Sequence, residues 1–172
     1  MNTGRRVFSS ALLFDGKGGA RELSDEQVAG WNPADGLLWV DFDQGSKKAK
    51  EWLVRDSGID RNVASMLMEG ETRPRSLAEA GGLVVIMRGI NMHPGALPDD
   101  MVAVRIWLEE NRIVSARRRK VLSVNDVRES LLAGKGPKTV GQFLVSITGR
   151  LTERIAAAVA NIEQLLEDLD AA

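Results

Sequence analysis

The residues of this sequence with the clearest chemical potential are two aspartates at the end of a hydrophobic run. They lie in "LLWVDFDQG", where Asp41 and Asp43 are separated by a single phenylalanine. Because side chains alternate along a strand, both carboxylates would point to one side, at the carboxyl edge of a sheet. Such a pair can supply an aspartate nucleophile and a general acid around a magnesium ion. The spacing therefore raises the hypothesis of a magnesium-dependent phosphohydrolase.

The residues after this pair argue against that hypothesis. The arrangement only partly resembles phosphohydrolases of the haloacid-dehalogenase type, which follow their D-x-D with a Gly-Thr or similar turn. Here the chain continues with Gln44, Gly45 and Ser46. Asp43 then belongs more simply to the turn before a helix that Ser46 caps. We therefore predict no catalytic residues and no enzymatic activity.

Other polar clusters are equally compatible with structural roles. Asp99 and Asp100 in "LPDDM" and the single histidine, His93, fall in a proline-containing loop, where such side chains are commonly solvated. The basic run "ARRRK" (116–120) could contact nucleic acid or phosphate, but no nucleic-acid-binding fold accompanies it. The glycines of "DGKGGA" do not form a phosphate loop, because Lys17 precedes the glycine pair and no Ser or Thr follows. No nucleic-acid partner and no bound cofactor are predicted, and any metal-ligating residues stay unknown.

Composition limits the class of protein. The chain has 172 residues, 44% of them hydrophobic, which is enough for one core and an appendage. A net charge of -1 provides no field that would attract nucleic acid or an anionic membrane. No cysteine is present, which excludes thiolate metal sites and fits a cytosolic protein. The apolar run "LVVIM" is far shorter than the ~20 residues of a bilayer span. We expect a soluble chain with no signal peptide.

Hydrophobic periodicity and capping residues predict alternating groups of strands and helices along the chain. Strands are expected at 7–14, in "ARELS", at 36–43, at 83–90 and as an antiparallel pair joined at Glu110 and Asn111. Helices are expected after Ser24 with Gln27, after Ser46, after Asp60, after Ser123 with Asp126 (ending at Gly134), and after Thr139 with Gln142. The segment 73–82 is expected to end the preceding helix at Pro74 and to connect it to the strand at 83–90.

This order predicts an α/β fold, specifically an α/β/α sandwich in which helices cover both faces of a mixed sheet. The strand "LVVIM" is apolar at every position, so both of its faces must be covered. Val84, Val85 and Ile86 are therefore expected to be buried. Arg105 and Trp107 in "RIWL" are expected to pack on a sheet face, with the arginine stem covering apolar surface.

The last segment predicts a long amphipathic helix that is too long for the domain to cover. Apolar residues follow one another in steps of three and four, with an extra step of four from Leu151 to Ile155: Val140, Leu144, Ile147, Leu151, Ile155, Val159, Ile162, Leu166 and Leu169. A helix of about thirty residues is roughly 45 Å long, which exceeds the diameter of a domain of this size. We therefore divide the chain into residues 1–137, the α/β/α domain, and 138–172, the projecting helix.

The order of these segments resembles the cytoplasmic N-terminal region of CorA-type metal ion transporters, specifically the ZntB zinc-transporter branch. The matching stretches are "GLLWVDFD", "GIDRNVASMLMEGETRPRS" and the run from "GGLVVIMRGIN" through "PDDM" and "RIWL" into the helical tail. They cover nearly all of the chain. The resemblance implies a funnel domain on the cytoplasmic side of the bacterial inner membrane, pentameric in the intact transporter, with zinc or another divalent cation as the transported ion.

The sequence also differs from the pattern of this family. Family members continue into further cytoplasmic helices, a stalk helix, membrane spans and a Gly-Met-Asn loop, none of which occurs in these 172 residues. Contact with the membrane is thus implied only through those further helices. An alternative is an interaction module that uses the last helix to bind a partner helix. Because the apolar residues from Ile155 to Leu169 would otherwise face water, we also expect the chain to self-associate through this helix, in an antiparallel or crossed arrangement.

Overall fold

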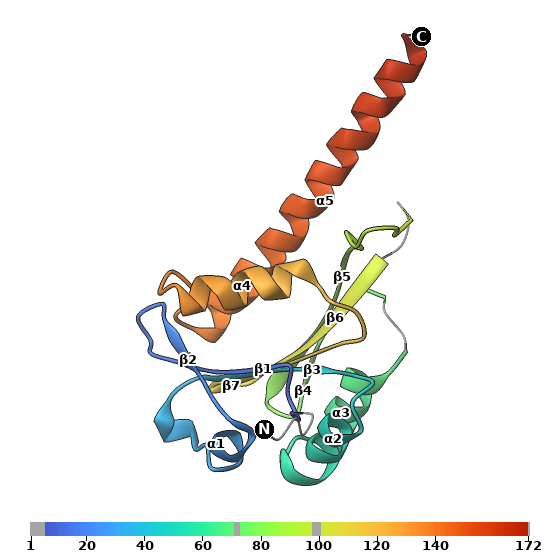
Figure 1. The fold of residues 1–172 in the computed structure, drawn as a ribbon. Coiled ribbons are helices and arrows are strands. Elements are labelled where there is room, and N and C mark those ends of the chain that lie inside the picture. The colour runs from blue at the N-terminus through green and yellow to red at the C-terminus, as the bar shows by residue number, and fades with distance from the viewer. Residues whose placement is uncertain (1–5, 71–72, 98–100, 172) are drawn as a thin grey trace, which may run out of the picture.

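The computed structural model describes residues 6–70, 73–97 and 101–171, and a seven-stranded mixed sheet forms its centre (Figure 1). The strands lie in the order β2-β1-β3-β7-β6-β5-β4. Their bounds are β1 Ser10–Phe14, β2 Ala20–Glu22, β3 Leu38–Asp43, β4 Arg75–Glu79, β5 Gly82–Ile90, β6 Met101–Leu108 and β7 Arg112–Arg117. Only the central pair β3 and β7 is parallel, and the other neighbours are antiparallel.

Helices cover both faces of this sheet, which confirms the predicted α/β/α sandwich (Figure 1). One layer contains α1 Asp25–Ala29, the short turn η1 Pro33–Asp35, α2 Lys47–Glu51, the π-helical turn η2 Trp52–Asp56 and α3 Arg61–Met68. The other contains α4 Leu122–Leu132 and α5 Val140–Asp170. Val84 and Ile86 face the first core and Val85 the second, and all three are buried as predicted.

Local capping signals place most helices where the sequence predicts them. Ser24 forms a complete capping box with Gln27, and Ser46 and Asp60 each accept a backbone N–H of the helix that follows. Thr139 caps α5 by accepting the Gln142 N–H. These bonds satisfy donors that every helix start leaves unpaired, so a few residues of sequence define the boundary.

Two predictions about local structure are wrong. Residues 75–79 form the edge strand β4, not a connection, and pair with β5 as a hairpin. Helix α4 begins after Val121, and Ser123 does not cap it: Ser123 is buried and its hydroxyl has no hydrogen-bond partner within the described residues. The burial of Val121, Val124 and Val127 against the sheet fixes the start of this helix instead.

The two halves of α5 lie in different environments. Phe143, Ile147 and Leu151 are buried in the second core, so the first turns of this 31-residue helix complete a layer of the sandwich. Beyond Leu151, Arg154 still pairs with Asp126 of α4, and from Val159 onward the helix projects beyond the sheet with its side chains exposed (Figure 1). Within the part of the chain that the structure describes, no helix combines the length and the apolar character needed to cross a bilayer.

Candidate functional site

The parallel pairing of β3 with β7 gives Asp41 a structural role. Asp41 lies opposite Ser115 in the register and is 1% exposed. Its carboxylate accepts hydrogen bonds from the Ser115 hydroxyl at 2.7 Å and from Arg117 Nε at 2.9 Å, with Arg117 Nη2 at 2.8 Å. The indole N–H of Trp39 donates to the Ser115 hydroxyl oxygen at 2.9 Å, which extends the network into the second core.

The electrostatics of this network are those of a buried ion pair. Burial raises the pKa of the Asp41 carboxyl above its ordinary value of 3.8, while the Arg117 guanidinium and the Ser115 hydroxyl oppose the rise. The positive charge of the Arg117 guanidinium directly compensates the negative charge of the Asp41 carboxylate. Both oxygens of Asp41 already have partners, and the side chain has almost no access to solvent. A substrate phosphate would have to displace these contacts, so Asp41 is not poised as a nucleophile.

Asp43 belongs to a turn, as the sequence predicts. Its Oδ1 accepts the Gly45 N–H at 2.7 Å, and its backbone carbonyl accepts the Ser46 N–H at 2.9 Å. Ser46 then caps α2. The two acids of the D-x-D therefore do different structural work and form no catalytic pair.

Among the residues that the structure describes, the other polar candidates do not assemble into a site. His93 lies with one ring nitrogen 3.1 Å from the Lys120 carbonyl, and Asp99 and Asp100 fall outside the described residues. The side chains of the basic run lie in two environments: Arg117 pairs with the buried Asp41, whereas Arg118, Arg119 and Lys120 are exposed. Across the described ranges, no group of three or more His, Cys, Asp or Glu side chains could hold a metal ion.

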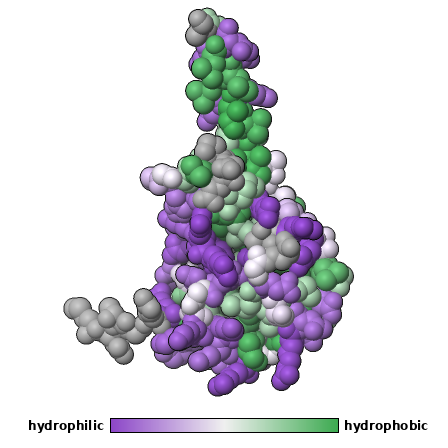
Figure 2. All heavy atoms as spheres, turned by 90° about the vertical axis from the view of Figure 1, so that its right-hand side faces the viewer, coloured by the Kyte–Doolittle hydropathy of each residue, from purple (hydrophilic) through white to green (hydrophobic). Residues whose placement is uncertain are grey.

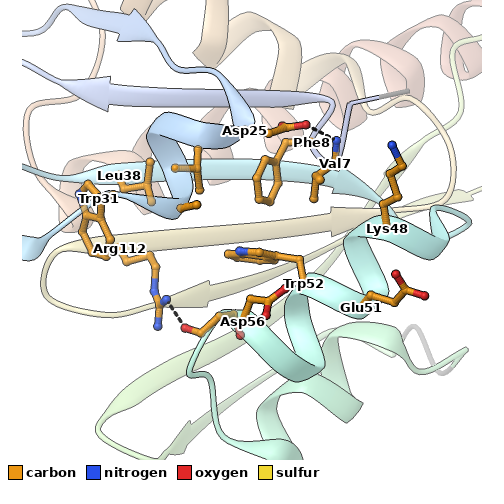
Figure 3. A pocket seen from close by; sticks show the side chains of 13 residues that line it. Val7, Phe8, Asp25, Trp31, Leu38, Lys48, Glu51, Trp52, Asp56 and Arg112 are labelled. Carbon is orange, nitrogen blue, oxygen red and sulfur yellow. Dashed lines mark hydrogen bonds between the residues drawn. The ribbon is translucent and has the colours of Figure 1, made fainter. Parts of the chain in front are cut away.

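A cavity of about 530 Å³ opens on the face covered by α1 to α3 (Figure 3). Aromatic side chains line it: Phe8 comes from the segment before β1, Trp52 from η2 and Trp31 from the turn after α1. Phe8 and Trp52 meet edge to face with their ring centroids 4.8 Å apart. This cavity could not be predicted from the sequence, because its lining comes from segments that are distant in the sequence.

Two charged groups of this cavity, Asp25 and Arg112, are engaged in contacts of the fold. Asp25 accepts the Val7 N–H at 2.9 Å, which ties the N-terminal segment to α1 (Figure 3). Arg112 donates to the Ser57 carbonyl at 2.6 Å and to both oxygens of Glu109, and its guanidinium lies over the Trp31 ring. The bond to Ser57 thus fastens the end of η2 to the sheet, and both Asp25 and Arg112 serve the fold.

Helix α5 carries two sets of apolar residues, and most of the second set is open to solvent. The first face, which we call the inner seam, consists of Val140, Phe143, Leu144, Ile147 and Leu151 and packs on the sheet. The second, which we call the outer seam, consists of Val145, Thr148, Thr152, Ile155, Val159, Ile162, Leu166 and Leu169, and its Thr148 hydroxyl lies 3.5 Å from the Met87 sulfur of β5. Figure 2 shows hydrophobic residues gathered along one side of the projecting helix. The large side chains of the outer seam, apart from the half-buried Ile155, are well exposed, from 47% at Val159 and Ile162 to 73% at Val145.

The sequence predicts the apolar stripe of α5: its residues from Val140 to Leu151 belong to the inner seam and those from Ile155 to Leu169 to the outer seam. The extra step of four from Leu151 to Ile155 marks the point where the stripe passes from the inner seam to the outer seam. The outer seam continues toward the start of the helix through Val145, Thr148 and Thr152, all of which are exposed. Threonines at two of these positions made that continuation hard to recognise from hydrophobicity alone.

The sandwich and its projecting helix define an α/β domain of the kind found in the soluble parts of CorA and ZntB. The fold of the ZntB cytoplasmic domain from Vibrio parahaemolyticus matches 94% of this chain and 64% of that one, with a TM-score of 0.79 at 23% identity. The chain belongs to the CorA-like Mg2+ transporter protein family, whose model matches residues 34–172.

Individual relatives agree with this family. The divalent cation transporter CmaX of Pseudomonas aeruginosa is 35% identical over 161 residues, which cover 92% of this chain and 48% of CmaX. The zinc transport protein ZntB of Enterobacter sp. is 32% identical over 160 residues, covering 93% and 48%. The structure of full-length CmaX superposes with a TM-score of 0.91 at 32% identity, over 98% of this chain and 53% of CmaX. The chain thus spans about half the length of the curated relatives it matches.

Proposed function

We propose that this chain is the cytoplasmic domain of a divalent metal ion transporter of the CorA-like family, with zinc as the first candidate for the transported ion. The observation that carries the proposal is the likeness to full-length CmaX, which extends over 98% of this chain. Similarity to several ZntB proteins supports zinc, whereas CmaX is named for divalent cations in general. The ion would be cargo of the intact transporter and not a resident cofactor of this domain.

In this proposal the chain has two parts. Residues 1–137 form the α/β/α cytoplasmic domain, and residues 138–172 form the helix that leads toward further cytoplasmic, stalk and membrane helices. Five copies would assemble in the intact protein on the cytoplasmic side of the bacterial inner membrane. Membrane contact would come through those further helices.

The proposal excludes catalysis by the D-x-D. The contacts of Asp41 with Arg117 and Ser115, and of Asp43 with the Gly45 N–H, support structural roles for both carboxylates. The purified chain with magnesium should not hydrolyse a phosphoester such as p-nitrophenyl phosphate. Turnover that requires magnesium and disappears in Asp41→Asn would establish the phosphohydrolase alternative.

A chimera tests the transport function directly. This chain would replace the matching 161-residue segment of CmaX, and the product would be reconstituted in vesicles that contain a metal-sensitive dye. We expect an influx of divalent cations that CmaX lacking this segment does not support. A chimera that folds and inserts but conducts neither zinc nor magnesium would contradict the proposal.

The open outer seam of α5 favours one alternative function, an interaction module that binds a partner helix. Reading the codons downstream in the gene separates the two. The transporter predicts apolar membrane spans around a Gly-Met-Asn motif, whereas an interaction module predicts a stop codon or an unrelated domain.

A further inference from the structure

Two cavities adjoin each other beside helix α2. The first is the cavity of about 530 Å³ described above, which we call the aromatic cavity. The second, which we call the polar cavity, has a volume of about 800 Å³. Val7, Phe8 and Lys48 line both cavities, so a single small molecule can extend from one into the other. Both volumes lie in the range of about 300–1,000 Å³ that small-molecule sites usually have.

The aromatic cavity offers flat apolar walls to a ligand. Phe8 is buried, whereas the rings of Trp31 and Trp52 are half-buried and border the open space (Figure 3). The Arg112 guanidinium lies over the Trp31 ring, 5.9 Å from its centroid, so this wall already packs against a flat polar group. Nucleic-acid bases stack on such aromatic side chains. Asp56 also lines the cavity, and its carboxylate can accept the amino hydrogens of a base.

The polar cavity has the charge to hold phosphate groups. Among the described residues that line it are three basic side chains, Arg6, Lys47 and Lys48, and one acid, Asp43. Asp43 is engaged in its turn, since its Oδ1 accepts the Gly45 N–H at 2.7 Å. Arg6 and Lys47 are exposed, so an anion can reach them from solvent. Arginine and lysine bind phosphate oxygens through charge-assisted hydrogen bonds.

The topology of the sheet also favours a ligand at the polar cavity. β3 and β7 are parallel neighbours, but the chain leaves them toward opposite faces: α2 follows β3 in one helical layer, and α4 follows β7 in the other (Figure 1). In open α/β sheets, ligands bind outside the carboxyl ends of strands at such a switch point. Asp43 is the last residue of β3, and the polar cavity is lined by Asp43 and by Gly45 and Ser46 of the turn that follows.

We propose that the two cavities form one binding site for a purine nucleotide. The base stacks in the aromatic cavity beside Trp31 and Trp52, and the phosphates lie in the polar cavity beside Arg6 and Lys47. The sugar passes Phe8, which lines both cavities. A nucleoside lacks the phosphate contacts and free pyrophosphate lacks the stacking, so the nucleotide binds more tightly than either part. This site is distinct from the transport function proposed above and does not depend on it.

Isothermal titration calorimetry of the 172-residue chain tests the affinity. The probes are ATP, GTP, adenosine and pyrophosphate, each in the presence of EDTA so that metal ions do not contribute. We expect ATP or GTP to bind at least about tenfold more tightly than adenosine or pyrophosphate. If neither nucleotide binds at millimolar concentration, or if adenosine or pyrophosphate alone binds as tightly as the nucleotides, the proposal is overturned.

Two charge reversals on α2 test the phosphate contacts. Lys47→Glu changes the polar cavity, and Lys50→Glu is the matched control, because Lys50 is an exposed lysine of the same helix that lines neither cavity. Lys47→Glu should weaken nucleotide binding at least about tenfold, whereas Lys50→Glu should change it less than about twofold at about 0.15 M salt, where distant charges are screened. Equal effects of the two variants would show non-specific attraction and overturn the proposal. Both positions are exposed, so both variants should keep the melting temperature of the wild type.

The four tryptophans of the chain report where the base binds. Trp31 and Trp52 line the aromatic cavity, whereas Trp39 and Trp107 are 1% exposed and line neither cavity. In proton–nitrogen correlation spectra of the isotope-labelled chain, the nucleotide should shift the indole N–H signals of Trp31 and Trp52, which the variants Trp31→Phe and Trp52→Phe assign. The signals of the two buried tryptophans should hardly move. A bound nucleotide that shifts neither the Trp31 nor the Trp52 signal would overturn the proposed site.

Discussion

The network around Asp41 allows a quantitative test of its structural role. Asp41→Ala removes the acceptor for the Ser115 hydroxyl and for two nitrogens of Arg117, whose side chain is only 18% exposed. Breaking a buried pair by removing one partner costs roughly 3–5 kcal/mol, and we expect the lower end, about 3 kcal/mol, because Arg117 keeps some contact with water. At about 2–4 °C per kcal/mol for a chain of this size, the melting temperature should fall by about 6–12 °C.

The appropriate assay is urea unfolding followed by far-UV circular dichroism, repeated at two protein concentrations so that self-association is separated from folding. Asp43→Ala is the matched control. It loses one bond, to the Gly45 N–H at an exposed turn where water can substitute, and should cost less than about 1 kcal/mol.

A double-mutant cycle identifies the origin of the loss. Arg117→Met in the Asp41→Ala background removes the uncompensated charge, so the double variant should be more stable than the sum of the two single losses predicts, by about 1–2 kcal/mol. The reasoning would be refuted if Asp41→Ala cost no more than Asp43→Ala. Strictly additive single losses would refute it as well.

Two further predictions follow from burial and backbone geometry. Because burial raises the pKa of the Asp41 carboxyl, the folded chain holds the carboxyl proton more tightly than the unfolded chain does. The stability that Asp41 contributes is therefore fully present below pH 3.8, the ordinary pKa, and is lost as the pH rises through the raised pKa of the folded state. Urea titrations at stepped pH should show the advantage of the wild type over Asp41→Ala/Arg117→Met shrinking with rising pH, and an advantage that grows would contradict the shift. Gly82→Ala should destabilise the chain by about 1–3 kcal/mol, because the new Cβ would lie 2.4 Å from a Trp107 ring carbon and 2.5 Å from the Leu108 carbonyl oxygen. Gly149→Ala, in the open interior of α5, should instead stabilise it by about 0.5–1 kcal/mol, and equal effects of the two substitutions in urea unfolding would show that crowding at Gly82 does not matter.

Local sequence determined the starts of most helices, because a cap involves only a few adjacent residues. Ser24, Ser46, Asp60 and Thr139 each accept a backbone N–H within three residues, as their spacing predicts. The burial of the strand "LVVIM" could also be predicted from local sequence, since an entirely apolar strand requires cover on both faces.

Strand β4 and the start of α4 could not be predicted in this way. Most side chains of β4 are exposed, so it lacks the alternation of a half-buried strand, and only its pairing with β5 makes it a strand. At α4, the Ser123 and Asp126 pattern resembles a cap, but burial of Val121 outweighed it. Packing against the sheet is a long-range effect that a four-residue pattern does not contain.

The features of the candidate site likewise separate into those that local sequence predicts and those that depend on long-range contacts. By itself, the sequence determined that Asp41 and Asp43 follow a buried strand, that Asp43 enters a turn, and that α5 has an apolar stripe longer than the domain. Only the tertiary structure decided that Asp41 meets Ser115 and Arg117, residues 74 and 76 positions away, because that contact depends on the parallel pairing of β3 with β7. It also decided that the sheet covers α5 only as far as Leu151, because the sheet is shorter than the helix packed on it.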